Sequence, residues 1–197
     1  DEAIAACKFL WISHAHPDHL SLESLERLRG KTILLPDHYG QRVLLGLGEM
    51  GFDAQVLPDA MWTPLSDRIR VLCISDYNQD GILLVELGGD TLVVDVNDGT
   101  DRGCGDLLHR QVGAHKKTFL LWLTGYGDAD MIHFVDESGR LVEPEAAKKH
   151  PIGPMIADVT RAFGFRYFVP FSSMHRYRRT DSAWANAYVT PLEDHAK

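Results

Sequence analysis

Residues 9–19 have the sequence FLWISHAHPDH. An apolar run over residues 9–12 ends at the polar Ser13, a pattern typical of a buried strand that opens into a loop. Three imidazoles and one carboxylate follow within six residues, and the ligand atoms that they offer suit zinc, iron and manganese. These side chains belong to His14, His16, Asp18 and His19.

The spacing of these four side chains favours a site for two cations. Two histidines separated by one residue can hold one cation, while the Asp18-His19 pair can turn toward a second. The alternative is an exposed polar loop that happens to be rich in histidine. The metal site is favoured, because lone histidines are common whereas this grouping after a buried strand is not.

The length and composition of the chain are those of an ordinary folded protein. It has 197 residues, of which 45% are hydrophobic and 24% are charged. Since no linker or internal repeat interrupts it, we expect a single domain over residues 1–197. The sequence begins at Asp1, without an initiating methionine, and enters the first strand within a few residues. We therefore expect a fragment of a longer chain.

Charge and cysteine content limit the partners and the compartment. The formal net charge of -8 disfavours a surface for nucleic acid or for an anionic membrane. No apolar run reaches the roughly 18 residues of a membrane span. The three cysteines, Cys7, Cys73 and Cys104, include no C-x-x-C pair, which argues against a disulfide framework and against a sulfur-only zinc site. A cytoplasmic location is expected.

The order of the predicted elements is that of an α/β protein with an antiparallel stretch in its middle. Apolar and β-branched runs predict strands at residues 9–12, 32–35, 69–74, 82–87, 91–96, 118–123 and 166–171. Helical spacing and capping residues predict helices at 21–29, 39–50, 105–111 and 154–163. Gly88-Gly89-Asp90 predicts a tight turn between two of the strands.

The pattern His-x-His-x-Asp-His after an apolar strand resembles the signature of the metallo-β-lactamase superfamily, and the similarity runs from about Lys8 to about His175. The resemblance implies a four-layer αββα sandwich with the metals at one edge, although two leading strands of that fold are not in evidence before Phe9. Three short segments of the sequence most resemble the branch that contains CMP-N-acetylneuraminate hydroxylases and ascorbate-phosphate lactonases. They are Trp11-Ile12-Ser13-His14, Val96-Asn97-Asp98 and Phe171-Ser172-Ser173-Met174-His175.

The resemblance also assigns ligand roles. It implies that His14 and His16 hold a first metal and that Asp18 and His19 hold a second, with Asp18 also orienting the attacking water. Asp98, at the end of a strand, takes the place of a carboxylate that bridges both metals. Asp95 is the competitor for that role, but it lies earlier in the strand, where its side chain would face a neighbour or solvent.

Two further ligand positions remain open. The family supplies a histidine just before the antiparallel pair, where this chain has Asp76, and Asp76 is our candidate ligand. A carboxylate there would favour iron or manganese over zinc. The alternative is that Asp76 caps a turn. His175 follows a late strand, as the last histidine of the family does. The alternative for His175 is a loop histidine beside the substrate pocket.

Substrate contacts are expected from two loops. Arg176 follows His175, and its guanidinium could recognise a carboxylate or phosphate, whereas Arg178 and Arg179 fit a solvated loop opposite Asp181. Tyr126 follows a buried strand and is expected to shape the rim of the pocket. The remaining histidines have no candidate partners at useful spacing, so we expect surface or packing roles for them. They are His38, His109, His115, His133, His150 and His195.

The residues and the resemblance together predict a metal-dependent hydrolase that acts on an ester, lactone, amide or phosphodiester bond of a small anionic substrate. We expect one or two divalent cations, zinc in the first place, with iron or manganese as alternatives. A second hypothesis is a non-haem iron hydroxylase, which would need a missing domain or a partner as electron donor, because no Rieske pattern is present. A third is a relative that binds a ligand without catalysis.

Overall fold

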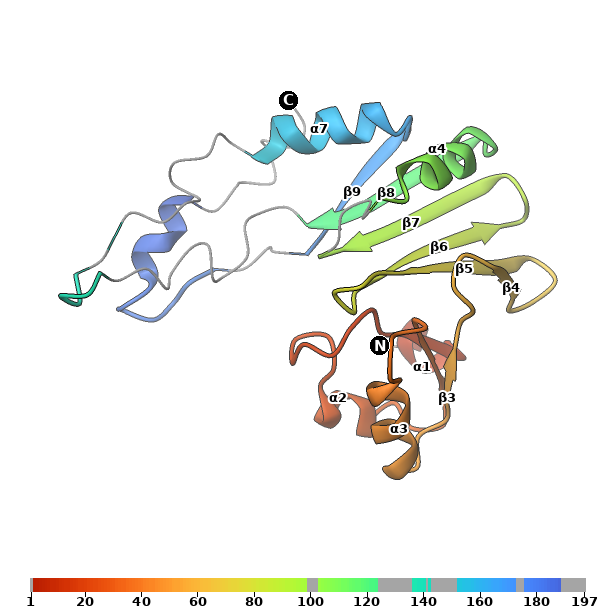
Figure 1. Ribbon diagram of the computed structural model, residues 1–197, viewed down its shortest axis with the longest axis horizontal. Helices are drawn as coiled ribbons and strands as arrows, with labels where there is room; N and C mark the ends of the chain where they lie inside the picture. Colours follow the sequence, from red (N-terminus) through yellow and green to blue (C-terminus); the bar gives the residue numbers. More distant parts are fainter. Residues whose placement is uncertain are drawn as a thin grey trace. The chain divides into compact units, whose positions relative to one another are not determined.

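The computed structural model describes residues 2–98, 103–123, 136–140, 142, 152–172 and 176–188 (Figure 1). The chain divides into two compact units, of which the first ends at Thr118 and the second begins at Phe119. Each unit is described by itself.

The first unit begins with the short helix α1 (Glu2–Ala6) and a three-stranded parallel sheet. Its strands lie in the order β1 (Phe9–Trp11), β2 (Thr32–Leu35) and β3 (Ala54–Val56). Parallel neighbours need crossover connections, and the helices α2 (Leu22–Glu26) and α3 (Arg42–Glu49) lie in these connections. The two helices lie on one face of the sheet (Figure 1). Between them and the sheet lies an apolar cluster. Its buried members are Ile12, Leu25, Ile33, Leu35 and Leu47.

The antiparallel sheet of the first unit contains β4 (Trp62–Pro64), β5 (Ile69–Ser75), β6 (Gly81–Leu87) and β7 (Thr91–Asn97). The register pairs Ser75 with Gly81 at one end of β5 and β6, and Ile69 with Leu87 at the other. The predicted turn is present between β6 and β7, where Gly88 and Gly89 have φ values of 61° and 79°. Such values suit glycine and form the tight hairpin turn.

The two sheets pack against each other through a second apolar cluster. Side chains alternate between the faces of a strand, so Leu34 points away from the helices that cover Ile33 and Leu35. It packs with Val71 and Cys73 of β5. The opposite face of the antiparallel sheet buries Leu72, Leu84 and Val94 to 1% exposure or less. Helix α4 (Gly105–Gly113) buries Leu108 and Val112.

The boundary falls within β8 (Lys117–Leu123), of which the second unit contains the part from Phe119 onward. This part pairs in parallel with β9 (Tyr167–Ser172). Helix α7 (Ile152–Ala162) and a 3-10 helix, η1 (Ala183–Tyr188), complete its described elements. Among the described residues of both units, no helix is long and apolar enough to cross a membrane. The mixed α/β class is thus confirmed, while the four-layer arrangement stays a prediction.

Several elements differ from the predicted bounds. The helix predicted at 21–29 ends at Glu26. The helix predicted at 39–50 begins only at Arg42, because Gly40 and Gln41 have positive φ values of 75° and 46°, which helical residues cannot adopt. Helix α1 and the three-residue strands β3 and β4 were not predicted. A strand of three residues carries too little alternation to be recognised from the sequence.

Candidate metal centre

The loop after β1 carries the candidate ligands of the motif. The backbone N–H groups of His19 and Leu20 both donate to the carbonyl oxygen of His16, at 2.9 and 2.8 Å, so the chain turns back on itself within the motif. His14 is buried, with 6% of its surface exposed, whereas His16 lies at the surface. The turn brings the ring centroid of His14 to 4.4 Å from that of His16 and to 4.2 Å from that of His19.

Asp98 reaches the same place from the other sheet of the first unit, directly after β7. Its Oδ2 atom lies 3.6 Å from Nε2 of His14 and 3.4 Å from Nε2 of His19. Nε2 of His14 lies 2.8 Å from Nδ1 of His16. Two histidines of a loop and a carboxylate 82 positions beyond the second of them therefore converge on one volume, since His14, His16 and Asp98 each direct one ligand atom there within 4.8 Å of the others.

These distances fit a divalent cation. A zinc ion that binds nitrogen and oxygen at roughly 2.0–2.2 Å with tetrahedral angles separates its ligands by about 3.4 Å. Within the set of His14, His16 and Asp98, the separations of 2.8 and 3.6 Å from Nε2 of His14 lie on either side of this value. The separation between Asp98 and His19 is 3.4 Å. Imidazole nitrogen with carboxylate oxygen also suits iron and manganese. The residues present can thus hold a metal at this position.

A second layer of side chains lies behind His14. Nδ1 of His14 lies 3.2 Å from Oδ1 of Asp80 and 3.0 Å from the hydroxyl of Ser13. The hydrogen bond to Asp80 raises the pKa of the His14 imidazole, against the effect of burial, and the nearby carboxylates of Asp98 and Asp18 act in the same direction. His38 is buried as well, and its Nε2 lies 3.1 Å from the carbonyl oxygen of Asp80.

The other predicted ligands lie in different settings. Asp18 is exposed, and one of its carboxylate oxygens lies 3.3 Å from Nε2 of His19. Asp76 accepts a hydrogen bond from the backbone N–H of Asp80, so it caps the turn between β5 and β6, as the alternative interpretation predicted. Its role as a ligand stays a prediction. Asp95 is half-buried within β7.

The predicted contributions of the second unit remain predictions. His175 and Tyr126 lie outside the described residues. Arg176 is exposed, and Arg179 pairs with Asp181 at 2.6 Å, as expected of a solvated loop. Neither observation relates these arginines to the metal centre.

A pocket of about 530 Å³ opens at the candidate metal centre. One wall holds the metal-site residues, and another is the turn between β5 and β6. Its lining residues are His14, Ala15, His16, His38, Val43, Tyr77, Asn78, Gln79, Asp80 and Asp98. Small-molecule sites are concave and carry a few convergent polar groups, and this pocket has both properties.

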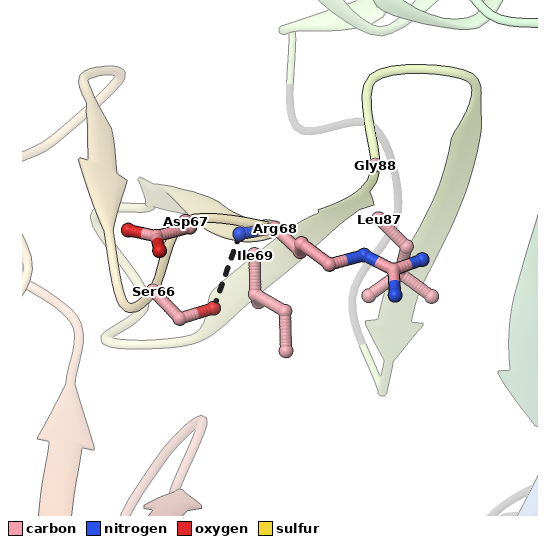
Figure 2. A pocket seen from close by; sticks show the side chains of 6 residues that line it. All are labelled: Ser66, Asp67, Arg68, Ile69, Leu87 and Gly88. Carbon is pink, nitrogen blue, oxygen red and sulfur yellow. Dashed lines mark hydrogen bonds between the residues drawn. The ribbon is translucent and has the colours of Figure 1, made fainter.

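A second pocket, of about 540 Å³, lies at the opposite end of β5 and β6 (Figure 2). Its polar groups include the hydroxyl of Ser66, which accepts a hydrogen bond from the backbone N–H of Arg68. Asp67 and Arg68 carry opposite charges, and both are exposed. Because it contains no imidazole or thiol and its charged groups are solvated, this pocket offers no comparable metal site.

Asp80 and His38 are the residues of the centre that the sequence did not reveal. His38 was expected to be a surface or packing residue because it has no ligand partner nearby in sequence, and its partner Asp80 lies 42 positions away. The signal that could have pointed to Asp80 is its position directly before a buried strand, β6, at the end of the sheet where β7 delivers Asp98. Polar residues at strand ends often form sites.

Comparison with known proteins supports the fold. Neither a scan against protein-family models nor a search of curated proteins gave a match. Among solved structures, Zn²⁺-bound PqqB from Methylobacterium extorquens matches with a TM-score of 0.51 and 18% identity, over 93% of this chain and 67% of that chain. The chain thus shares its fold with this structure, and its mixed sheets and helices are consistent with a metallo-β-lactamase-like fold. At this identity the likeness concerns the fold alone, and it does not confirm the branch of CMP-N-acetylneuraminate hydroxylases.

A second structure, the "Putative metal-dependent hydrolase" from Parabacteroides distasonis, matches with a TM-score of 0.44 and 13% identity. The match covers 84% of this chain and 77% of that chain.

Proposed function

We propose that the chain is a metal-dependent hydrolase that cleaves an ester, lactone, amide or phosphodiester bond of a small anionic substrate. The observation that carries this proposal is the convergence of His14, His16, His19 and Asp98 at separations that suit a divalent cation. When bound, such a cation lowers the pKa of water and polarises the oxygen of a carbonyl or phosphoryl group. Zinc is the first expectation, with one or two ions.

The residues around this position would have different roles in the reaction. His14 and His16 would hold the cation, and their Nε2 and Nδ1 atoms face each other. Oδ2 of Asp98 lies 3.6 Å from Nε2 of His14 and 3.4 Å from Nε2 of His19, so Asp98 would be the ligand shared by two cations. Asp18 has 76% of its side chain exposed, so its carboxylate is accessible to solvent and could orient the attacking water and accept its proton.

The charge of the pocket bears on the substrate. The described residues that line it include no lysine or arginine. An anionic substrate would therefore be neutralised by the bound cation and by a guanidinium from elsewhere. Arg176, exposed in the second unit, is our candidate for that guanidinium, and Tyr126 is the candidate for the rim.

One observation favours a second candidate function. His14, His16 and Asp98 form a set of two imidazoles and one carboxylate, which is also the ligand set of non-haem iron oxygenases. With iron bound, the same residues could support hydroxylation, and the chain would then need an external electron donor.

Metal analysis with a matched pair of variants tests the proposal. The protein is purified without chelator, and its metals are quantified by elemental analysis. His16→Ala removes a ligand at the surface and is expected to reduce metal content at least tenfold and to abolish hydrolysis. His109→Ala removes an exposed histidine of α4 and is expected to change neither. Full metal occupancy and full rate in His16→Ala would exclude His16 as a ligand.

Turnover separates the candidate functions. The loaded protein is offered p-nitrophenyl acetate, a γ-lactone and bis(p-nitrophenyl) phosphate, and oxygen uptake is recorded in parallel with a chemical reductant. Hydrolysis with zinc or manganese supports the first candidate. Oxygen uptake that depends on iron supports the second. Bound metal with neither reaction would contradict both and favour a relative that only binds a ligand.

A further inference from the structure

Asp80 is the group behind the candidate metal centre that the proposed function does not yet use. It lies in the turn between β5 and β6, and its carboxylate is 14% exposed. The oxygen Oδ1 lies 3.2 Å from Nδ1 of His14. The other nitrogen of the same ring, Nε2, faces His16 and Asp98. The two edges of the His14 ring thus face different groups: the inner edge faces Asp80, and the outer edge faces the candidate ligands.

The surroundings of Asp80 hold its carboxylate in place. Its backbone N–H donates to Oδ1 of Asp76 at 2.9 Å, and the N–H of Asp76 donates to the carbonyl oxygen of Asp80 at 3.0 Å. Its own Oδ1 accepts a hydrogen bond from the N–H of Gly81 at 3.0 Å, and His38 contacts its carbonyl oxygen at 3.1 Å. Three of these contacts hold the backbone of Asp80, and the bond from Gly81 orients its carboxylate. The side chain therefore has less rotational freedom to lose when it binds an imidazole.

Gly81, the next residue, allows this turn to pack closely against the parallel sheet. A Cβ atom on Gly81 would lie 2.5 Å from Cγ of Pro36 and 3.2 Å from Cζ2 of Trp11. Trp11 ends β1, three residues before His14, and Pro36 directly follows β2. The absence of a side chain at Gly81 therefore brings Asp80 close to the loop that carries His14.

An imidazole that binds a metal through one nitrogen must carry its proton on the other. A carboxylate at Nδ1 stabilises the Nδ1–H form, which leaves the lone pair of Nε2 free toward the metal and fixes the plane of the ring. Resting on the metal site of the proposed function, we propose that Asp80 is a positioning residue that holds His14 in the Nδ1–H tautomer and so raises the affinity of the centre for its cation.

Ser13 is the competing partner of the same nitrogen, since its hydroxyl lies 3.0 Å from Nδ1 of His14. A hydroxyl can donate or accept, so it is compatible with either tautomer. An ionised carboxylate only accepts, and it therefore imposes a proton on Nδ1. The variants of Asp80 separate the two partners, because they leave Ser13 unchanged.

Zinc affinity and the tautomer of His14 are measured together. The probe is Zn²⁺ alone, titrated against a chromophoric chelator, and the tautomer is read from the ¹⁵N shifts of Nδ1 and Nε2 in the metal-free protein at a pH where the ring is neutral. Asp80→Ala is expected to weaken zinc binding about 10- to 100-fold and to move His14 toward the Nε2–H form. Asp80→Asn keeps an acceptor oxygen of the same shape, so the losses should be smaller than in Asp80→Ala.

The matched control is Asp59→Asn. Oδ1 of Asp59 accepts a hydrogen bond from the N–H of Ser75 at 2.7 Å, at the same end of β5. The described partners of the His14 ring do not include Asp59. This variant is expected to keep wild-type zinc affinity and the wild-type tautomer. If Asp80→Ala leaves affinity or tautomer unchanged, or if Asp59→Asn weakens binding as much, Asp80 does not position His14. Should Asp80→Ala fail to fold, the comparison of Asp80→Asn with Asp59→Asn decides in the same way.

The two proposals fail separately. A wild-type protein that binds no zinc, iron or manganese would overturn the metal centre. The tautomer of His14 in the metal-free protein would still show whether Asp80 controls the ring.

Discussion

Glu86 lies within the antiparallel sheet and is 8% exposed. Its carboxylate accepts two hydrogen bonds from the guanidinium of Arg70, at 2.6 and 2.5 Å, and lies 2.9 Å from Nε2 of His115. The guanidinium in turn lies over the ring of Trp62, 4.5 Å from its centroid. The hydrogen bond from Arg70 lowers the pKa of Glu86, and His115 acts in the same direction.

This pKa shift predicts how stability depends on pH. Because the pKa of Glu86 is lower in the folded protein than its ordinary value of 4.5, the folded state binds fewer protons than the unfolded state near that pH. The stabilisation is therefore fully present above pH 4.5 and is lost as the pH falls through the folded pKa. Glu86→Gln should be less stable than wild type at neutral pH, and the difference should shrink under acid conditions, as measured by urea unfolding.

The control for this prediction is Glu23→Gln. Glu23 pairs with Arg27 on the surface of α2, and both side chains are more than three-quarters exposed. Exposed pairs of this kind contribute about 0.3–0.5 kcal/mol, so the free energy of unfolding should hardly change. A loss in Glu86→Gln that is the same at acid and neutral pH would show that the carboxylate acts through packing and not through its charge.

At the level of the elements, substitution by alanine is expected to have opposite effects on stability at two glycines of the first unit. In Gly81→Ala, at the start of β6, the new methyl group would meet the ring of Pro36 at 2.5 Å, and we expect a loss of about 1–3 kcal/mol in the free energy of unfolding. In Gly46→Ala, within α3, the methyl group would meet nothing within 4 Å. A gain of roughly 0.5–1 kcal/mol is expected, because alanine favours the helix. Chemical denaturation of both variants checks the pair, and a Gly81→Ala protein as stable as wild type would contradict the close packing of this turn.

Most elements could be predicted from the sequence because their patterns are local. The strands β5, β6 and β7 and the turn at Gly88 and Gly89 follow from runs of apolar residues and from glycines next to each other. The start of α3 could not be predicted, since Tyr39 continues the helical pattern while the left-handed residue Gln41 interrupts the backbone. Strands β3 and β4 gain their stability from pairing with β2 and β5, and pairing partners cannot be read from three residues.

At the level of the whole molecule, the candidate metal centre was predictable only in part. His14, His16 and His19 lie within six residues, so their grouping is visible in the sequence. Asp98 lies beside them because the two sheets pack together through a shared apolar core. Neither sequence segment alone specifies this packing. The resemblance to a family predicted that Asp98 joins the histidines. It did not supply Asp80, because the contact of this residue with His14 depends on the close approach of one turn to the parallel sheet.

Because the candidate ligands come from the loop after β1 and from the end of β7, a cation would join the two sheets of the first unit. An ion that binds the folded state and not the unfolded state adds about 2.7 kcal/mol of stability at a free concentration of 100 times its Kd. For a chain of this length each kcal/mol raises Tm by about 2–4 °C, so zinc should raise Tm by about 5–10 °C over protein in chelator. Scanning calorimetry measures the shift, and His16→Ala should lose it. A shift of equal size in His16→Ala would show that zinc stabilises the protein from some other position, such as the thiols of Cys7 and Cys104.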